Sequence, residues 1–447
     1  MTQLPSFSPT RQNRELGPKW LRTTVFPLFL LCACPPFVML LWFTHTHLDG
    51  SLSKLARLLW NEGMLHTLQV VWVPRMFGSA LAWKILGIYV AVELLLLRFL
   101  PGKLVYGPIT AKGHVPKYVD NGVASFAMTV GLYLTCSYVL HLFPASILYD
   151  NLGELLGSLN LFALLFCVVL YLKGRFAPST PDHGLSGNPI FDYYWGTELY
   201  PNLLGWDVKR MTNCRFGMMG WPLLLLSYAA KQHEVYGISD SMLVAVGIQL
   251  VYIAKFFHWE TGYLRTLDIM HDRAGFYICW GCLVWLPCIY TSGTMYLVNH
   301  PHNLGTPLAI TLFALGVLAV LVNYLADEQR QRVRATSGHT TVWGKPPRLL
   351  IGHYTTEQGE KKENILLASG YWGLARHFHY LPELAAALLW SLPALFDSAL
   401  PYFYFVFLTI LLVDRSYRDD ERCAKKYGTD WDEYRKLVPH RILPGIY

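Results

Sequence analysis

Charged residues are scarce in this chain of 447 residues, at 15%, whereas soluble proteins carry about a quarter. Hydrophobic residues make up 53%, and the mean hydropathy is +0.29. This composition excludes intrinsic disorder, and the long apolar blocks argue against a secreted soluble enzyme. The net charge of +7 does not indicate a nucleic-acid partner. The composition indicates a polytopic membrane protein.

The sequence also lacks the common signatures for phosphate and metal binding. No Gly-x-Gly-x-x-Gly follows an expected strand, and no P-loop Gly-Lys-Ser/Thr occurs. A nucleotide would therefore have to bind without either cradle. The nine cysteines are an odd number. Cys279 and Cys282 have CxxC spacing, but no second pair completes a zinc site, so packing is the favoured role and we expect no metal.

Long apolar stretches recur along the chain. A membrane-spanning helix needs about 20 mostly apolar residues. The sequence predicts an all-α fold with about ten such helices. They are expected near residues 23–43, 77–100, 124–145, 155–172, 217–230, 242–257, 276–297, 305–325, 381–396 and 399–413.

The basic residues test this assignment independently. If the N-terminus and every even-numbered connection face the cytosol, most of the 37 lysines and arginines lie on that side. The opposite connections hold only Lys54, Arg57, Arg75 and Lys231. The positive-inside rule therefore supports an even number of spans, with both ends of the chain in the cytosol.

Ionisable residues cluster around the end of the sixth predicted span. Tyr252, Lys255 and Glu260 fall close to helical spacing on one face. Ionisable groups at membrane depth are costly and usually face a cavity or a partner. A tyrosine or carboxyl group there could supply a proton to a buried substrate. The structural alternative is a Lys–Glu pair that fixes helix packing, and the sequence leaves both open.

Asp268, His271 and Asp272 follow at spacing i, i+3 and i+4, so they can converge on one helical face. The spacing suits a His–carboxylate acid/base pair or a metal site. Without a further ligand cluster, a hydrogen-bond network or the polar wall of a substrate cavity is favoured over a metal. The same applies to His377 and His379.

Two polar segments near the C-terminus could bind phosphate and nucleoside groups. Arg330 and Arg334 are four residues apart, and two guanidiniums on a helix end can grip a phosphate. The alternative is an anchor on anionic lipid headgroups. The tail combines acidic and aromatic residues that could hold a ribose or an adenine. Its alternative is an amphipathic helix on the membrane surface.

Several segments together resemble the sterol reductase family, and within it the Δ7 branch. The resemblance covers nearly the whole chain after the first 60 or so residues. The matching stretches include WGTELYP at 195–201, NCRFG at 213–217, WGCLVWLP at 280–287, SGYWGLARHF at 369–378, RDDERC at 418–423 and LPGIY at 443–447.

The resemblance implies a cofactor and a set of residues that bind it. The cofactor of the family is NADPH, held at the cytosolic face without a Rossmann fold. Arg330 stands where related enzymes can have lysine, and His379 where some members have asparagine. The positions that match are Arg330, Arg334, Leu367, Trp372, His379, Tyr380, Asp419, Cys423, Tyr427 and Tyr434.

The resemblance further implies reduction of the 7,8 double bond of 5,7-diene sterols. An isolated alkene is a poor hydride acceptor, so a carbon must first be protonated, and a cavity that excludes water protects the resulting cation. We expect a cytosolic segment at 1–22, transmembrane helices at 23–230, and a catalytic region with the NADPH and sterol pockets at 231–447. Tyr252 is the first candidate for the proton relay, followed by Glu260, Asp268, His271 and Tyr290.

Three other functions compete with this interpretation. The nearest is reduction of the sterol Δ14 double bond, by the other branch of the family. The second is an S-adenosylmethionine-dependent membrane methyltransferase, which the pattern of Arg418, Glu421, Tyr427 and Tyr434 resembles. The third is a non-catalytic sterol-binding scaffold. We expect the lipid bilayer and a sterol as partners, and association with other enzymes of sterol biosynthesis. The expected location is the endoplasmic reticulum membrane, or the inner membrane if the source is bacterial.

Overall fold

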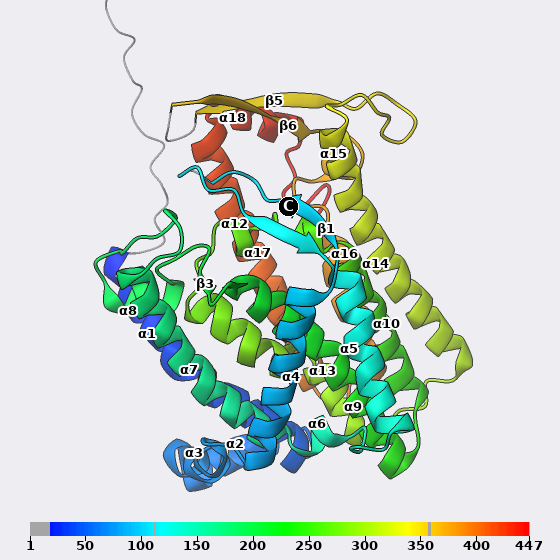
Figure 1. The fold of residues 1–447 in the computed structure, drawn as a ribbon. Helices are drawn as coiled ribbons and strands as arrows, with labels where there is room; N and C mark the ends of the chain where they lie inside the picture. The colour runs from blue at the N-terminus through cyan, green and yellow to red at the C-terminus, as the bar shows by residue number, and fades with distance from the viewer. Residues whose placement is uncertain (1–17, 111, 356–358, 447) are drawn as a thin grey trace, which may run out of the picture.

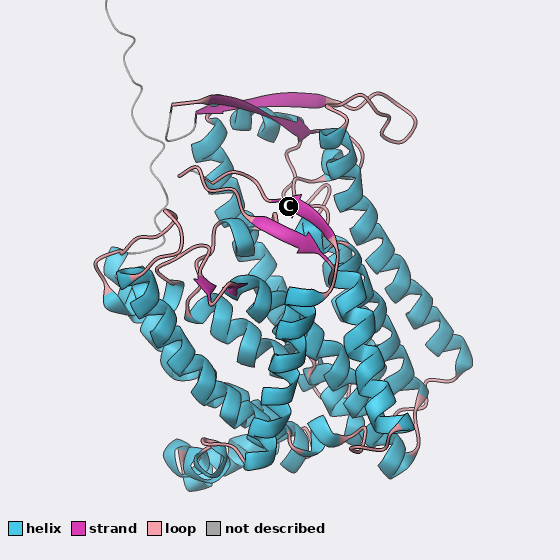
Figure 2. Cartoon of the chain, in the orientation of Figure 1, coloured by secondary structure: helices cyan, strands magenta, loops and turns pink. Residues whose placement is uncertain are grey.

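The structure is a computed structural model that describes residues 18–110, 112–355 and 359–446. It is a bundle of helices with three small hairpins outside the bundle (Figures 1 and 2). The helices are α1 Phe26–His47, α2 Leu52–Glu62, α3 Met64–Val71, α4 Ala80–Phe99, α5 Gly122–Leu134, α6 Ile147–Asp150, α7 Leu152–Phe176, α8 Pro189–Trp195, α9 Met218–Tyr236, α10 Asp240–His258, α11 Glu260–Tyr263, α12 Leu267–Met270, α13 Ser292–Asn299, α14 Thr306–Ala335, α15 Tyr371–Leu374, α16 Tyr380–Ser391, α17 Phe403–Tyr427 and α18 Thr429–Leu437.

The remaining helical segments are π-helical or 3₁₀-helical. The π-helical segments are Leu21–Val25, Thr135–Val139, Arg210–Gly217 and Phe276–Tyr290. The 3₁₀ turns are Val73–Arg75, Leu392–Ala394 and Leu400–Tyr402. Three antiparallel hairpins pair β1 Lys103–Tyr106 with β2 Lys117–Asp120, β3 Asn202–Leu203 with β4 Trp206–Asp207, and β5 Leu349–Thr355 with β6 Lys361–Leu367. The predicted all-α fold is thus confirmed for the bundle. The three β-hairpins were not predicted from the sequence.

Within the described residues, seven helical segments are long and apolar enough to cross a membrane. They are Leu21–His47, Ala80–Phe99, Gly122–Val139, Leu152–Phe176, Asp240–His258, Phe276–Asn299 and Thr306–Ala335, and each coincides with a predicted span. The three other predicted spans fall on α9, α16 and α17. Those helices give a weaker signal for a membrane span. α16 is too short to cross a membrane by itself, and the second half of α17 is charged. A polytopic fold is therefore confirmed, and about ten spans fits the arrangement.

The two ends of the bundle differ. In Figure 1, α2, α3 and α6 lie at one end, whereas β5, β6 and α18 cover the other. The described chain begins and ends near the second end, in agreement with an even number of spans. The segments rich in lysine and arginine also lie there, which assigns this end to the cytosol by the positive-inside rule.

Close approach of α10 and α14 positions the residues of the site. A Cβ on Gly247 would come within 2.8 Å of Phe313, and one on Gly316 within 2.5 Å of Ile248. Glycine at each contact makes room for a large side chain of the other helix, so the two helices pack closely, as is common between membrane helices. α16 packs against both of them. The three helices therefore bring distant parts of the sequence to one cavity.

Candidate active site

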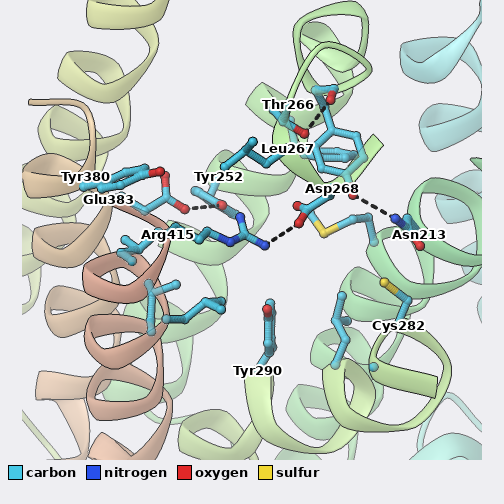
Figure 3. Close-up of a pocket in the computed structure, with 18 of the residues that line it drawn as sticks. Asn213, Tyr252, Thr266, Leu267, Asp268, Cys282, Tyr290, Tyr380, Glu383 and Arg415 are labelled. Carbon is cyan, nitrogen blue, oxygen red and sulfur yellow. Dashed lines mark hydrogen bonds and ion pairs between the residues drawn. The ribbon is translucent and has the colours of Figure 1, made fainter. Parts of the chain in front are cut away.

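A cavity of about 310 Å³ lies inside the C-terminal half of the bundle (Figure 3). Its walls come from α10, the α11–α12 segment, the π-helical segment Phe276–Tyr290, α14, α16 and α17. One part is apolar and aromatic, lined by Met218, Ile278, Trp285, Leu286, Tyr404, Phe407, Leu408, Leu411 and Leu412. Another part is polar, lined by Lys255, Asn323, Asp327, Arg330 and His379. The cavity thus has both apolar aromatic and charged lining residues.

Tyr252 also lines the cavity. Its hydroxyl donates a hydrogen bond to Glu383 Oε1 at 2.5 Å (Figure 3). The ring contacts Trp221 and Trp390, with centroids 5.8 and 5.5 Å away. These aromatic contacts hold the phenol ring, because α9, α10 and α16 all contribute to them. The phenol therefore lines the cavity with its hydroxyl held by a carboxyl group that also lines it.

Asp268 and Tyr290 also line the cavity. Asp268 forms an ion pair with Arg415 at 2.5 Å, which joins α12 to α17 (Figure 3). The Tyr290 ring packs 4.6 Å from that of Tyr404. Three of the five predicted catalytic candidates, Tyr252, Asp268 and Tyr290, are thus brought together.

Arg330 and His379 are two of the polar residues that line the cavity. The Arg330 guanidinium lies 3.9 Å from the centroid of the Trp372 ring and pairs with Asp327 at 3.3 Å. The Nε atom of Arg330 and the Nδ1 atom of His379 are buried without a hydrogen-bond partner in the structure. Burial lowers the pKa of His379 well below its usual value, so its ring is neutral at physiological pH. Two buried polar atoms are therefore left for a ligand to satisfy.

The remaining predicted cofactor residues lie above the cavity, around β6, α17 and α18. Tyr434 donates a hydrogen bond to the carbonyl of Leu367 at 2.8 Å. Tyr427, Cys423 and Tyr434 belong to one apolar cluster with Trp431 and Val438. Arg334 donates to the carbonyl of Ile365 at 3.3 Å, so β6 links this cluster to α14. The side chain of Trp372 donates to the carbonyl of Ala326 at 2.7 Å.

Asp419 connects this cluster with the cavity side. Its carboxylate pairs with Arg422 at 2.6 Å and lies 4.0 Å from His377. Burial alone would raise the pKa of Asp419, but Arg422 and His377 hold it below its usual value. Tyr380, which follows His379, stacks on His377 with centroids 5.2 Å apart and lines the cavity.

Two predicted catalytic candidates lie outside the cavity. Glu260 is 1% exposed and forms ion pairs with Arg215 at 2.7 Å and Arg210 at 3.3 Å. Burial alone would raise its pKa, but the two arginines lower it below the usual value, so it is a bound anion. His271 is 47% exposed in its side chain, and its Nδ1 lies 2.9 Å from the buried Asp272. Glu260 thus joins segments of the bundle, whereas His271 lines a second cavity together with Trp195 and Arg273.

The polar cavity residues that were not predicted from the sequence include Glu383, Arg415, Asn323 and Asp327. Lys255 hydrogen-bonds to Asn323, whose amide donates to the carbonyl of His379 at 2.8 Å. Helical spacing offered one usable signal, because Glu383 follows Tyr380 by three residues in the same helix. No comparable signal points to Asn323 within its apolar span.

Residues 27–447 match the Ergosterol biosynthesis ERG4/ERG24 family. The chain belongs to this family. A 7-dehydrocholesterol reductase of Arabidopsis thaliana is 51% identical over 422 residues, which cover 94% of this chain and 96% of the relative. A second one, of Danio rerio, is 34% identical over 99% of this chain and 95% of the relative.

The family also includes enzymes named for a different double bond. A Delta(14)-sterol reductase of Methylotuvimicrobium alcaliphilum is 37% identical over 98% of this chain and 96% of the relative. Membership of the family and the apolar helices together establish a multi-pass membrane protein. The sequence-based assignment to the sterol reductases is thus confirmed.

Proposed function

We propose that this protein reduces the 7,8 double bond of 5,7-diene sterols with NADPH, as a step of sterol biosynthesis. The observation that carries the proposal is the single cavity lined both by apolar aromatic walls and by Arg330 and His379. A flat hydrocarbon such as a steroid ring system suits the first set of residues, and the phosphates of a dinucleotide suit the second.

Tyr252 is proposed as the group that donates a proton to the alkene. Its side chain lines the cavity, and the rings of Trp221 and Trp390 pack against it. Protonation of the diene creates a carbocation, which water would quench and which aromatic faces stabilise. Tyr290 and Tyr404 supply such faces in the apolar part of the cavity.

The residues predicted to hold NADPH fit such a cofactor. Arg330 offers a buried Nε without a partner, and His379 a buried Nδ1. Arg330 and Arg334 would hold phosphate groups, and the cluster of Cys423, Tyr427 and Tyr434 would hold a nucleoside. NADPH supplies a hydride when it is bound. Asp268 and Arg415 would position the reacting groups, because they form an ion pair at the cavity wall.

Reduction of the sterol Δ14 double bond is the alternative that the comparisons also support. The relative named Delta(14)-sterol reductase is 37% identical, which is as similar as one 7-dehydrocholesterol reductase, that of Xenopus laevis. The higher identity of 51% to the Arabidopsis relative favours the Δ7 reaction. The family match gives no support to the methyltransferase. Residence in the endoplasmic reticulum and association with other sterol-biosynthetic enzymes stay predictions.

The proposal is tested with purified protein in detergent. The protein is incubated with 7-dehydrocholesterol and NADPH deuterated at the transferred position, and the label is located in the product. A second incubation uses an 8,14-diene sterol. We expect one deuterium in the B ring of the 7,8-reduced product. Reduction of the 8,14-diene alone would reject the Δ7 assignment, and no turnover of either sterol would favour a non-catalytic scaffold.

A further inference from the structure

Glu383 is the closest polar neighbour that the structure gives to the Tyr252 hydroxyl. The two residues are 131 positions apart in the sequence, on α16 and α10, and their oxygens are 2.5 Å apart (Figure 3). This is at the short end of the range for O–H···O hydrogen bonds. Both side chains line the cavity, so neither is a remote packing contact.

The cationic residues of the same cavity are paired elsewhere. Arg415 pairs with Asp268 at 2.5 Å, Arg330 with Asp327 at 3.3 Å, and Lys255 hydrogen-bonds to Asn323. Within the described part of the chain, no lysine or arginine lies within ion-pair distance of Glu383. The carboxyl group therefore faces the phenol rather than a counter-ion.

A phenol acting alone is a poor acid for an alkene. Its reference pKa is about 10, and loss of its proton would leave a phenolate directly beside Glu383. If Glu383 is ionised at that moment, two negative charges stand at hydrogen-bond distance, which opposes the transfer. If Glu383 carries a proton, the phenol oxygen can accept that proton while it gives up its own. Only one negative charge then results, and it rests on a carboxylate.

We propose that Glu383 is the proton reservoir behind Tyr252. This inference rests on the proposed function and assigns the origin of the proton. The O–H bond of Tyr252 breaks as a C–H bond forms on the sterol, and the O–H bond of Glu383 breaks as Tyr252 is reprotonated. The hydride from NADPH completes the reduction, and solvent returns a proton to the Glu383 carboxylate. Glu383 acts through Tyr252, as a positioning and proton-supplying residue.

The test compares Glu383→Gln, Glu383→Asp, Tyr252→Phe and the double variant Tyr252→Phe/Glu383→Gln with the wild type. Glutamine keeps the size and hydrogen bonding of glutamate but has no transferable proton. We expect Glu383→Gln to lower kcat by about 100-fold or more, as for loss of a general acid, with the KM values for sterol and NADPH little changed. Glu383→Asp should restore part of kcat. The double variant should be no slower than Tyr252→Phe, because the two residues act as one unit.

A readout independent of turnover accompanies the kinetics. The infrared spectrum of the wild-type protein should contain a protonated-carboxyl band that shifts in deuterated water and is missing from Glu383→Gln. Glu363→Gln is the matched control, because the Glu363 side chain is 70% exposed on β6. That variant should keep both the band and the wild-type kcat.

Each outcome decides the proposal. The relay is wrong if Glu383→Gln keeps the wild-type kcat. It is also wrong if the fold-decrease in kcat of the double variant equals the product of the fold-decreases of the two single variants. In both cases the reductase function stands. If Glu383→Gln does not fold, a folded Glu383→Asp that lacks the band but keeps the wild-type kcat would equally overturn the relay. If the wild type reduces neither sterol, the proposed function itself fails.

Discussion

Replacement of Glu260 by glutamine tests whether this residue stabilises the fold as a buried anion or acts as a catalytic acid. The structure holds Glu260 between Arg215 and Arg210, with the Arg215 pair at 2.7 Å and both partners nearly fully buried. At this separation and an effective dielectric constant of about 20, one such pair attracts with about 6 kcal/mol. Desolvation offsets part of that attraction. Breaking a buried pair costs about 3–5 kcal/mol, because it leaves an uncompensated charge.

We therefore expect Glu260→Gln to lower the free energy of unfolding by about 3–5 kcal/mol, a large part of the stability of an ordinary protein. The assay is thermal unfolding of the detergent-solubilised protein, with turnover measured on the fraction that stays folded. That fraction should keep its kcat within about threefold, because Glu260 is outside the cavity. Glu363→Gln, on the exposed hairpin, serves as the control with unchanged stability. A Glu260→Gln protein of normal stability that has lost its turnover would refute this reasoning.

Two further predictions concern the cofactor side. Arg330→Ala should raise the Kd for NADPH about 10- to 100-fold, because charge-assisted hydrogen bonds contribute about 1.5–3 kcal/mol. The control variant Arg330→Lys keeps the charge and should keep most of the affinity. If a titration gives the same Kd for Arg330→Ala and the wild type, the assignment of Arg330 to a phosphate group is wrong. Burial lowers the pKa of His377 to about 4, so the folded state holds it neutral. Between pH 6.5 and pH 4 the unfolded state binds a proton at His377 and the folded state does not, so the free energy of unfolding falls as the pH falls. The loss is about 2 kcal/mol at pH 5, and the full stability is present above the unfolded pKa of about 6.5. Unfolding measured at pH 7 and pH 5 should show a loss about 2 kcal/mol larger in the wild type than in His377→Gln, and an equal loss in both would contradict it.

The sequence predicted the helical bundle well because its signals are local. A membrane span is a property of about 20 consecutive residues, and seven predicted spans coincide with helices of sufficient length and hydropathy. The spans on α9, α16 and α17 gave weaker signals, since polar residues enter those helices. The hairpins were missed because each strand is short and outside the apolar pattern.

The site was predicted less evenly. Spacing placed Tyr252 and Glu260 on one face, but that spacing could not show which of them faces the cavity. Glu260 instead meets Arg215, which is 45 residues away in the sequence and belongs to a different helical segment. His271 shares a short segment with Asp268, yet one is exposed and the other lines the cavity.

The amino-acid sequence alone determined that this protein is a multi-spanning membrane protein, because hydropathy is summed over neighbouring residues; that both ends lie on the basic side stays a prediction. It also carried the family resemblance, through short stretches that keep their order. Only the tertiary structure decided that Tyr252 meets Glu383 and that Asp268 meets Arg415. Those contacts depend on how α10, α12, α16 and α17 pack, and the packing depends on glycine contacts and ion pairs between segments far apart in the chain.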